Sequence, residues 1–321
     1  MRVLITGATG LIGQAITGLL HQQGHAVHYL TTSRKKIVHQ DNYRGFYWDP
    51  RNGEMDMESL TGVNAIINLA GATVTKKWTK AYKKQIQDSR THSLATLKRA
   101  IENAEHLKID SFVSASAIGI YPSSFDSLYD EDEIKVDESF LGSVVKNWEQ
   151  ELDGIKSFGF PVATIRIGLV LAAEGGALDK MTQPIRNYVG AAFGSGEQWQ
   201  SWIHINDLAR MFLHVIANKF EGIFNGVAPN PVTNTKLTRE IAAILQRPLF
   251  LPNIPQIAMK IALGEMSYIL FSSQRVSSIK IQKTGFEFNH SNLQSALSDL
   301  LLSENHKDSG SKSSVLNEFA Q

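Results

Sequence analysis

Short apolar runs alternate with segments of helical periodicity through the first half of the chain. The segment 11–23 places its apolar residues on one helical face, and Gly24 follows at a position typical of a helix end. Such alternation of strand and helix predicts βαβ units with a parallel sheet. The predicted strands are 3–6, 27–31, 63–69, 112–114 and 162–171, and the longer predicted helices are 80–105, 144–156 and 207–217, the last capped by Asn206 or Asp207.

The second half of the chain is richer in glycine and is punctuated by proline. We therefore predict an α/β fold in which a doubly wound parallel sheet (a Rossmann fold) carries a smaller C-terminal substrate lobe. The final segment has few large apolar residues and is predicted to be a disordered tail. The boundaries are 1–171 for the Rossmann domain, with 202–228 returning to it, 172–201 and 229–302 for the lobe, and 303–321 for the tail.

Composition narrows the function classes. The 321 residues include 32 Lys+Arg and 31 Asp+Glu, a formal net charge of +1, so neither nucleic acid nor a membrane is an expected partner. The chain has no Cys, which excludes thiol nucleophiles, iron–sulfur clusters and cysteine zinc sites. His21, His25 and His28 lie close together in the sequence, but no carboxylate completes a metal site with them, so no metal is expected. Any redox chemistry then requires a bound organic cofactor. The apolar run at residues 3–5 is too short for a signal peptide or a membrane span, so a cytoplasmic protein is predicted. The expected partner is a small-molecule substrate of unknown identity, and the oligomeric state is not predicted.

A glycine pattern lies between the first predicted strand and the first predicted helix. Gly7, Gly10 and Gly13 form a G-x-x-G-x-x-G element. The first two glycines allow a tight turn and close backbone approach, and the third allows close packing of the helix. This context favours a dinucleotide pyrophosphate at the helix N-terminus over a purely structural turn.

The end of the second predicted strand indicates which dinucleotide binds. An NAD site typically has an acidic residue about 20 residues beyond the glycines. Here Thr32, Ser33 and Arg34 are followed by two lysines, and no acidic residue occurs before Asp41. Hydroxyls and cations suit a 2′-phosphate, so the sequence predicts NADP. A solvated basic loop is the alternative, and the position directly after the strand favours phosphate binding.

Several motifs in this order resemble the extended short-chain dehydrogenase/reductase superfamily, and the likeness covers nearly the whole chain. More narrowly, the chain is similar to a nucleotide-sugar-epimerase-like subfamily that has a short C-terminal domain of its own. The motifs are TGATGLIG at 6–13, NLAG at 68–71, Trp148-Glu149, RIGLVLAAEGGAL at 166–178, GSG at 194–196 and WIHINDLA at 202–209.

The resemblance implies a set of cofactor-binding residues. It implies a phosphate turn, a region around the adenosine 2′-phosphate, and the adenine and ribose side of the site. These are, in that order, Gly7, Thr9, Gly10, Leu11, Ile12 and Gly13; then Thr32, Ser33 and Arg34; then Asn68, Leu69, Ala70 and Gly71. Arg90 would reach back toward the cofactor, and the alternative for it is a surface pair along a helix.

The acid/base residues of the superfamily are predicted to be missing. Its members use a Ser, a Tyr and a Lys four residues after the Tyr, and the Lys lowers the pKa of the Tyr. When positions are counted back from Glu149, the Tyr falls on Leu141 and the Lys on Val145, and neither side chain carries a proton. Lys146 is the next residue, but one residue along a helix is a rotation of about 100°.

Ser116 and Tyr121 are the remaining catalytic candidates. Tyr121 could supply a proton, although with no cation expected beside it we expect a pKa near the usual value of about 10. A wall of the substrate pocket is the alternative for Tyr121, and it is the favoured one. His204 and Asp207 are candidate bases, for which a structural role is favoured.

The resemblance implies an NADP(H)-binding, epimerase-like oxidoreductase that transfers hydride at a carbon bearing oxygen in a small polar metabolite. We expect the substrate cleft near Ser116, Tyr121, Gly168 and Trp202. Loss of the Tyr and Lys favours an alternative of another class, a catalytically silent NADP-binding protein that senses the cofactor or presents a surface to a partner.

Overall fold

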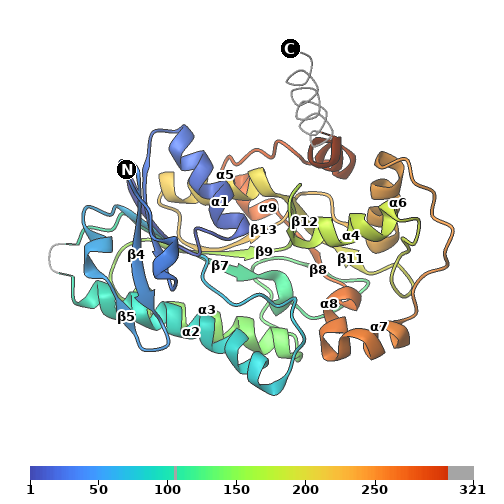
Figure 1. The fold of residues 1–321 in the computed structure, drawn as a ribbon, viewed down its shortest axis with the longest axis horizontal. Helices are drawn as coiled ribbons and strands as arrows, with labels where there is room; N and C mark the ends of the chain where they lie inside the picture. The colour runs from blue at the N-terminus through green and yellow to red at the C-terminus, as the bar shows by residue number, and fades with distance from the viewer. Residues whose placement is uncertain (105–106, 303–321) are drawn as a thin grey trace, which may run out of the picture.

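A large, mostly parallel sheet crosses the molecule (Figure 1). The computed structural model describes residues 1–104 and 107–302, so the predicted tail lies outside the described residues. From one edge to the other the strands are β13 (Gly222–Gly226), β9 (Val162–Ile167), β7 (Ser111–Ala117), β6 (Ala65–Asn68), β1 (Arg2–Thr6), β2 (Ala26–Thr31), β4 (Tyr43–Asp49) and β3 (His39–Gln40). Among the described strands of this sheet, β3 and the short β5 (Glu54–Met55) alone run antiparallel, both against β4. The predicted Rossmann fold is confirmed.

Helices cover both faces of this sheet. On one face α1 (Leu11–Gln22) packs against α5 (Ile205–Ala217), and on the other α2 (Lys80–Glu102) packs against α3 (Phe140–Lys156) (Figure 1). Parallel strands covered on both faces are expected to be continuously apolar, which explains the unbroken apolar runs in the sequence.

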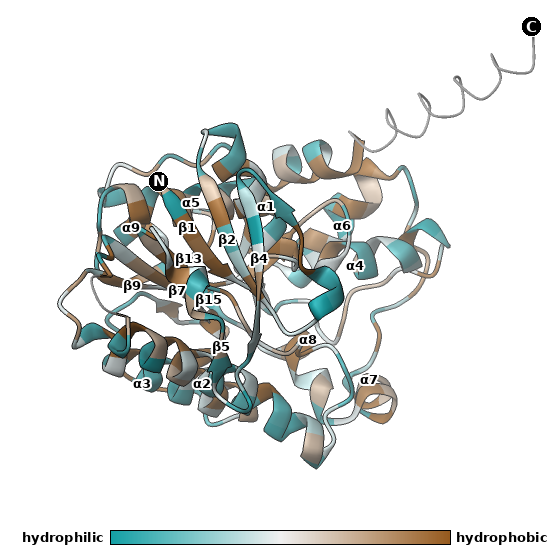
Figure 2. Ribbon diagram, turned by 60° about the vertical axis from the view of Figure 1, so that its left-hand side comes forward, coloured by the Kyte–Doolittle hydropathy of each residue, from teal (hydrophilic) through white to brown (hydrophobic). Residues whose placement is uncertain are grey.

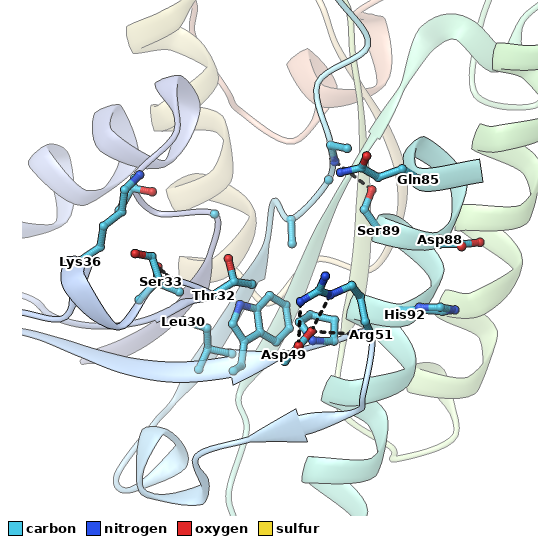
Figure 3. A pocket seen from close by; sticks show the side chains of 18 of the residues that line it. Leu30, Thr32, Ser33, Lys36, Asp49, Arg51, Gln85, Asp88, Ser89 and His92 are labelled. Carbon is cyan, nitrogen blue, oxygen red and sulfur yellow. Dashed lines mark hydrogen bonds and ion pairs between the residues drawn. The ribbon is translucent and has the colours of Figure 1, made fainter. Parts of the chain in front are cut away.

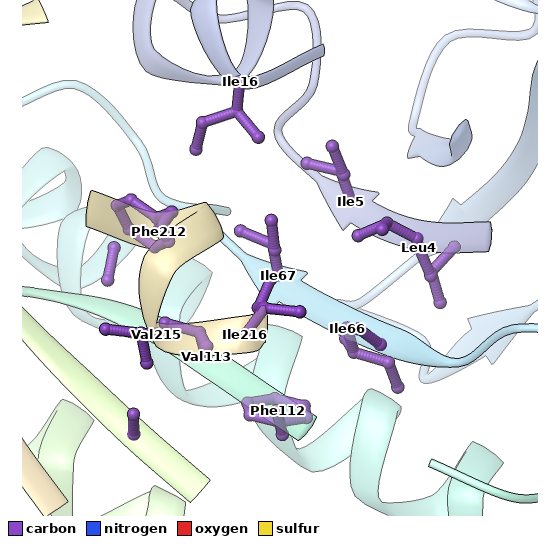
Figure 4. Packing of buried hydrophobic residues seen from close by; sticks show 14 of the residues in the cluster. Leu4, Ile5, Ile16, Ile66, Ile67, Phe112, Val113, Phe212, Val215 and Ile216 are labelled. Atoms are coloured by element: carbon purple, nitrogen blue, oxygen red, sulfur yellow. The ribbon is translucent and has the colours of Figure 1, made fainter. Parts of the chain in front are cut away.

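The main core lies on both faces of the central strands, against α1 and α5 on one face and against α2 and α3 on the other. Isoleucine, valine and phenylalanine side chains from these elements interdigitate there (Figure 4). Figure 2 shows the same segregation, with hydrophobic strands inside and hydrophilic residues on the outer faces of the helices. The labelled core residues are Leu4, Ile5, Ile16, Ile66, Ile67, Phe112, Val113, Phe212, Val215 and Ile216.

A second core lies beside the sheet, in the C-terminal lobe. It joins α4 (Gly176–Arg186), α6 (Asn234–Ile244) and the helical residues 293–302. Short strand pairs connect this lobe to the sheet: β10 (Leu169–Leu171) with β12 (Trp202–His204), β11 (Trp199–Gln200) with β14 (Val232–Thr233), and β8 (Leu128–Tyr129) with β15 (Arg275–Val276). The remaining helices are α7 (Gln256–Leu263), α8 (Tyr268–Phe271) and α9 (Ile279–Lys283).

The predicted strand 162–171 is divided in two. β9 ends at Ile167 and pairs with β7 and β13, whereas β10 pairs with β12. Gly168 makes the change of partner possible, because a Cβ there would lie 2.2 Å from the carbonyl oxygen of Ser201. The chain thus leaves the main sheet at a glycine where another backbone approaches closely.

Two predicted helix starts need correction. α3 begins at Phe140 rather than residue 144, and the Ser139 hydroxyl caps it by accepting from the Gly142 N–H. α5 is capped by His204, whose Nδ1 accepts from the Asn206 N–H, and not by either predicted residue. The imidazole can replace the usual capping oxygen because its unprotonated nitrogen is also an acceptor.

The sheet register brings three loops to one edge. Thr6 pairs with Leu30 of β2 on one side and with Asn68 of β6 on the other. The segments that follow these three strands therefore emerge together at the carboxyl edge of the sheet, where α/β folds bind ligands. Among the described helices none is long and apolar enough to cross a bilayer.

Candidate functional site

The glycine turn connects β1 directly to α1. Gly7 has φ +74°, and a Cβ on it would lie 3.1 Å from the Leu69 carbonyl oxygen, so the turn presses against the chain after β6. A Cβ on Gly13 would lie 2.3 Å from the Gly7 oxygen, which shows how closely α1 packs on the turn. Gly10 is the N-cap of α1 and provides no side-chain cap. The first turn of α1 thus presents its N–H groups and the positive end of its dipole to a ligand.

A cavity of about 850 Å³ extends from this turn along the edge of the sheet; we call it the cofactor cavity (Figure 3). It lies between the segment after β2 and the first half of α2. A volume of this size is within the range of about 300–1,000 Å³ typical of ligand pockets. Its lining includes Gly7, Thr9, Thr31, Thr32, Ser33, Lys36, Trp48, Asp49, Arg51, Ala70, Gly71, Ala72, Lys84, Gln85, Asp88, Ser89 and His92.

The end of the cavity at β2 is lined by hydroxyls and one lysine. Thr32, Ser33 and Lys36 face it, as Figure 3 shows. Arg34 does not belong to the lining, and its guanidinium lies 3.9 Å from the centre of the Tyr47 ring instead. The predicted role of Arg34 in phosphate binding stays a prediction, and Lys36 is the cation that the fold places on the cavity wall.

The part of the lining at the end of β4, the neighbour of β2 in the sheet, includes a pair that the sequence analysis missed. Asp49 is buried at the end of β4, and Arg51 donates to its two oxygens from Nε at 3.1 Å and Nη2 at 3.0 Å. This contact with Arg51 lowers the pKa of the Asp49 carboxyl below its usual value. The charge of Asp49 is therefore matched by Arg51. The aromatic residues of β4 are a strand signal that could have located this wall.

The buried side chain of Asn68 links the end of β6 to the neighbouring strands β1 and β7 by hydrogen bonds. Its side chain accepts from the Thr6 hydroxyl at 2.8 Å and donates to the Ser114 hydroxyl at 3.1 Å. The Thr6 oxygen also accepts from the backbone N–H groups of Leu69 and Ala70, both at 3.0 Å. These bonds fix the loop that presents Ala70 and the following glycine to the cavity.

Arg90 is a largely buried cation behind that loop. Its Nη1 donates to the carbonyl oxygens of Ala72 at 3.2 Å and Ile86 at 2.8 Å, and its guanidinium lies 5.0 Å from the Trp148 ring centre. Burial lowers the pKa of Arg90 to about 10. No ion pair joins it to a carboxylate among the described residues. A buried cation without a counter-ion is unfavourable unless an anion binds nearby.

The structure thus divides the predicted cofactor residues into those that line the cofactor cavity and those that do not. Gly7, Thr9, Thr32, Ser33, Ala70 and Gly71 line the cofactor cavity. The others lie outside its lining: Gly10, Leu11, Ile12, Gly13, Arg34, Asn68, Leu69 and Arg90. Their direct contact with a cofactor stays a prediction.

Ser116 belongs to a buried polar cluster. Its hydroxyl donates to Glu149 Oε1 at 2.6 Å. Arg166 donates to the same carboxylate from Nε at 2.9 Å and from Nη2 at 2.8 Å. The side chains of Arg166 and Glu149 are only 6% and 15% exposed, so this pair is largely removed from water. The cluster connects β7, α3 and β9.

Tyr121 extends this cluster and is fully buried. Its hydroxyl donates to Asn225 Oδ1 at 2.7 Å and accepts from Arg166 Nη1 at 3.0 Å. Burial raises the pKa of Tyr121 to about 12, although Arg166 opposes this. The expectation of no neighbouring cation and a pKa near 10 is therefore wrong. Neither Tyr121 nor Ser116 lines the cofactor cavity, and their catalytic roles stay predictions.

The two positions predicted for the superfamily's Tyr and Lys lie on the first turns of α3. Val145 is buried against Tyr121, and Leu141 is half-buried next to it on the helix. Lys146 is exposed, in keeping with the rotation expected for the next residue along a helix. Val145, at the position predicted for the lysine, makes an apolar contact, so neither of the two predicted positions carries a titratable group.

His204 and Asp207 stabilise the C-terminal segment. Buried Asp207 accepts from the backbone N–H groups of Asn289 at 2.9 Å and His290 at 2.8 Å. His204, His290 and Asp299 place their ligand atoms within 4.8 Å of one another. However, His204 Nδ1 accepts from a backbone N–H, so its Nε2 carries the proton and donates to Asp299 at 3.2 Å. A neutral imidazole in this arrangement has no lone pair left for a metal.

A second cavity, of about 510 Å³, lies in the C-terminal lobe; we call it the lobe cavity. It opens beside the loop after β6, at α4 and α6. Its lining includes Thr73, Thr75, Leu169, Lys180, Met181, Ile185, Phe193, Gln200, Asn234, Thr238, Ile241, Ile254, Ile269 and Leu270. Gly168, Trp202, Ser116 and Tyr121, around which the substrate cleft was expected, do not line it.

Comparison with known proteins places this geometry in a family. The sequence model described as "NAD dependent epimerase/dehydratase family" matches residues 3–226, and a domain of unknown function, DUF1731, matches residues 254–300. The chain belongs to the NAD dependent epimerase/dehydratase family. The resemblance to the extended short-chain dehydrogenase/reductases is thereby confirmed, and the DUF1731 match covers the short C-terminal domain.

Relatives in this family match almost end to end. The epimerase family protein YfhF of Bacillus subtilis is 35% identical over 94% of this chain and 98% of its own. A chloroplastic homologue of epimerase family protein SDR39U1 from Arabidopsis thaliana is 33% identical over 92% of this chain and 86% of its own. The crystal structure of human epimerase family protein SDR39U1 (isoform 2) with NADPH is 29% identical, with a TM-score of 0.80, over 94% of this chain and 99% of that one.

Proposed function

We propose that the protein is an NADP(H)-dependent oxidoreductase or epimerase of the short-chain dehydrogenase type. The observation that carries this proposal is the course of the cofactor cavity. It begins at the open N-terminus of α1 and ends at Thr32, Ser33 and Lys36. A helix N-terminus suits a pyrophosphate, and a hydroxyl-rich segment with a cation suits a 2′-phosphate. The NADPH in the structure of human SDR39U1 supports the same choice.

The charges around the cavity favour NADP over NAD. No carboxylate occurs in the segment 31–36, where a ribose 2′-hydroxyl would need an acceptor. The nearby carboxylate of Asp49 already accepts four hydrogen bonds, from Arg51 and Asn52. A carboxylate has about four lone-pair sites, so Asp49 is saturated within the protein.

In this function the bound nicotinamide supplies the hydride chemistry. The chain binds and orients the dinucleotide through the glycine turn and the loop at Ala70 and Gly71. Arg90, a buried cation next to that loop, adds positive potential where the ligand is negatively charged. We keep Ser116 and Tyr121 as the proton-transfer candidates. Because both hydroxyls are buried, a conformational change must expose them before either can transfer a proton to a substrate.

A catalytically silent NADP-binding protein is the second candidate. One specific observation favours it: both side chains of the expected acid/base pair are apolar, and Tyr121 is enclosed by Arg166 and Asn225. Such a protein would use the same cofactor cavity to sense NADPH or to present a surface to a partner. The cytoplasmic location stays a prediction for both candidates.

Titration calorimetry with NADPH, NADH and their oxidised forms tests the proposal. We expect one site per chain and clearly tighter binding of the phosphorylated forms. Equal affinities would contradict the role of residues 31–36, and no binding at millimolar cofactor would overturn the function as a whole. A panel of carbonyl compounds, followed by the absorbance of NADPH, separates the candidates. Turnover supports the enzyme, and tight binding without turnover across the panel supports the silent protein.

A further inference from the structure

The lobe cavity lies next to the cofactor cavity. Residues 70–72 line the cofactor cavity, and Thr73 and Thr75 on the same loop line the lobe cavity. On the other side, a Cβ on Gly176 would lie 3.0 Å from Leu11 Cδ2, so the start of α4 contacts the glycine turn. The two cavities are therefore neighbours, separated by this loop and by the contact between α4 and α1.

Most of the lobe cavity wall is apolar. Side chains from β10, α4, α6 and α8 converge on it, and the mostly apolar 189–193 segment closes one side. Its aliphatic, aromatic and thioether groups include Leu169, Met181, Ile185, Phe193, Ile241 and Leu270. Such a wall stabilises a ligand by removing apolar surface from water, at about 25 cal/mol per Å².

The threonine and asparagine side chains in this wall already have partners within the protein. The hydroxyls of Thr73 and Thr75 bond each other at 2.9 Å. Asn234 Oδ1 accepts from the Phe193 N–H at 2.9 Å, and the Thr238 hydroxyl donates to the Asn234 carbonyl oxygen at 2.9 Å. These groups hold the cavity open and offer little to a strongly polar ligand.

Two polar side chains of the lining remain available. No hydrogen bond or ion pair joins the Lys180 ammonium or the Gln200 amide to another described residue. Among the described residues that line the cavity, Lys180 alone is charged, and its side chain is exposed. A single cation beside an otherwise apolar wall matches one anionic group on an apolar body.

We propose that the substrate of the lobe cavity is a largely apolar carbonyl compound with a single carboxylate, and not a nucleoside-diphosphate sugar. This inference rests on the proposed function, because the cofactor cavity must hold the dinucleotide. A nucleoside diphosphate carries several charges and hydroxyls that need matched donors, and a wall with one cation would leave them unpaired. The small polar metabolite expected by resemblance is replaced by an amphipathic one.

Calorimetry on the NADP⁺-saturated protein tests the inference with decanoate, decan-2-one and UDP-glucose as probes. We expect decanoate and decan-2-one to bind at one saturable site per chain and UDP-glucose to bind at least tenfold more weakly than either. Tighter binding of UDP-glucose, or absence of binding by both decane derivatives, would overturn the inference. A separate titration with NADP⁺ alone shows whether the cofactor site, and with it the proposed function, fails independently.

Substitutions in the wall distinguish this cavity from adventitious surface binding. Lys180→Gln should weaken the binding of decanoate about tenfold and leave the binding of decan-2-one unchanged, since only decanoate is charged. Lys236→Gln, at an exposed position on α6 outside the lining, is the matched control. Met181→Gln should weaken both decane derivatives severalfold, whereas Met259→Gln on α7 should weaken neither. Equal effects of Lys180→Gln and Lys236→Gln would refute the proposed carboxylate contact.

Discussion

Arg166 donates from Nη1 to the hydroxyl oxygen of Tyr121 at 3.0 Å, while its other donors hold the carboxylate of Glu149. A cation thus lies beside a tyrosine, as in the Tyr-Lys pair of the superfamily, but the tyrosine proton is donated to Asn225. The contact with Arg166 by itself favours the phenolate, but Tyr121 is fully buried, and burial outweighs the contact and keeps the phenol neutral. The cluster joins β7, β9, β13 and α3, so we assign it chiefly to the stability of the sheet end.

Removing the cation from this cluster should strongly destabilise the fold. Arg166→Met leaves the Glu149 carboxylate 15% exposed and without its partner, which typically costs about 3–5 kcal/mol. Urea denaturation measures the loss. The matched control is Lys156→Met, which breaks an exposed pair with Asp153 and should cost less than about 1 kcal/mol. Similar losses in the two variants would show that the buried cluster contributes little.

Alkaline pH should reveal the burial of Tyr121. Burial raises its folded-state pKa to about 12, above the value of about 10 in the unfolded chain. Between these values the unfolded chain releases its proton first, so the free energy of unfolding is unaffected below pH 10 and falls as the pH rises toward 12. Tyr268, whose pKa burial also raises to about 12, adds to the fall.

Urea midpoints from pH 9 to pH 11.5 measure this slope. In Tyr121→Phe the free energy of unfolding should fall less steeply with pH, by about 1.4 kcal/mol per pH unit, because one proton fewer is released on unfolding. Tyr188→Phe, at a half-exposed tyrosine, should leave the slope unchanged. An identical slope in the wild-type protein and Tyr121→Phe would mean that the phenol is not held neutral.

Two glycines of α1 should respond in opposite directions to alanine. A Cβ on Gly13 would lie 2.3 Å from the Gly7 oxygen, whereas a Cβ on Gly18 meets nothing within 4 Å. Gly13→Ala should displace the turn, weaken NADPH binding and destabilise the protein by about 1–3 kcal/mol. Gly18→Ala should stabilise it by about 0.5–1 kcal/mol through helix propensity. Thermal unfolding and NADPH titration of both variants measure these effects, and unchanged NADPH affinity in Gly13→Ala would contradict the role of the turn.

Two neighbouring lysines should differ in their effect on cofactor choice. Lys36 lines the cofactor cavity and Lys35 does not. Lys36→Ala should weaken NADPH binding about tenfold and leave NADH binding unchanged, because it removes one charge-assisted contact to a phosphate. Lys35→Ala should leave both affinities near those of the wild-type protein. If both lysine variants weaken NADPH binding equally, the contribution comes from the overall positive charge of the segment and not from a specific contact of Lys36.

Local patterns in the sequence were sufficient to predict the strands and the helix around the glycine turn. β1, α1 and β2 follow directly from an apolar run, a helical periodicity and a second apolar run. The parallel Rossmann sheet followed from their repetition and is confirmed. β4 was missed because its glycine and mixed burial give no simple periodicity, and the Asp49–Arg51 pair was missed with it.

What the sequence by itself determined is the fold class, the glycine turn and the segment without carboxylates that follows β2, because each depends on residues close together along the chain. The tertiary structure alone decided which side chains meet. Tyr121 and Asn225 are 104 residues apart in the chain, and Lys180 reaches the same cavity wall as Leu270. Such contacts depend on strand register and on the packing of the C-terminal lobe, and burial then sets the pKa and the polarity of each site.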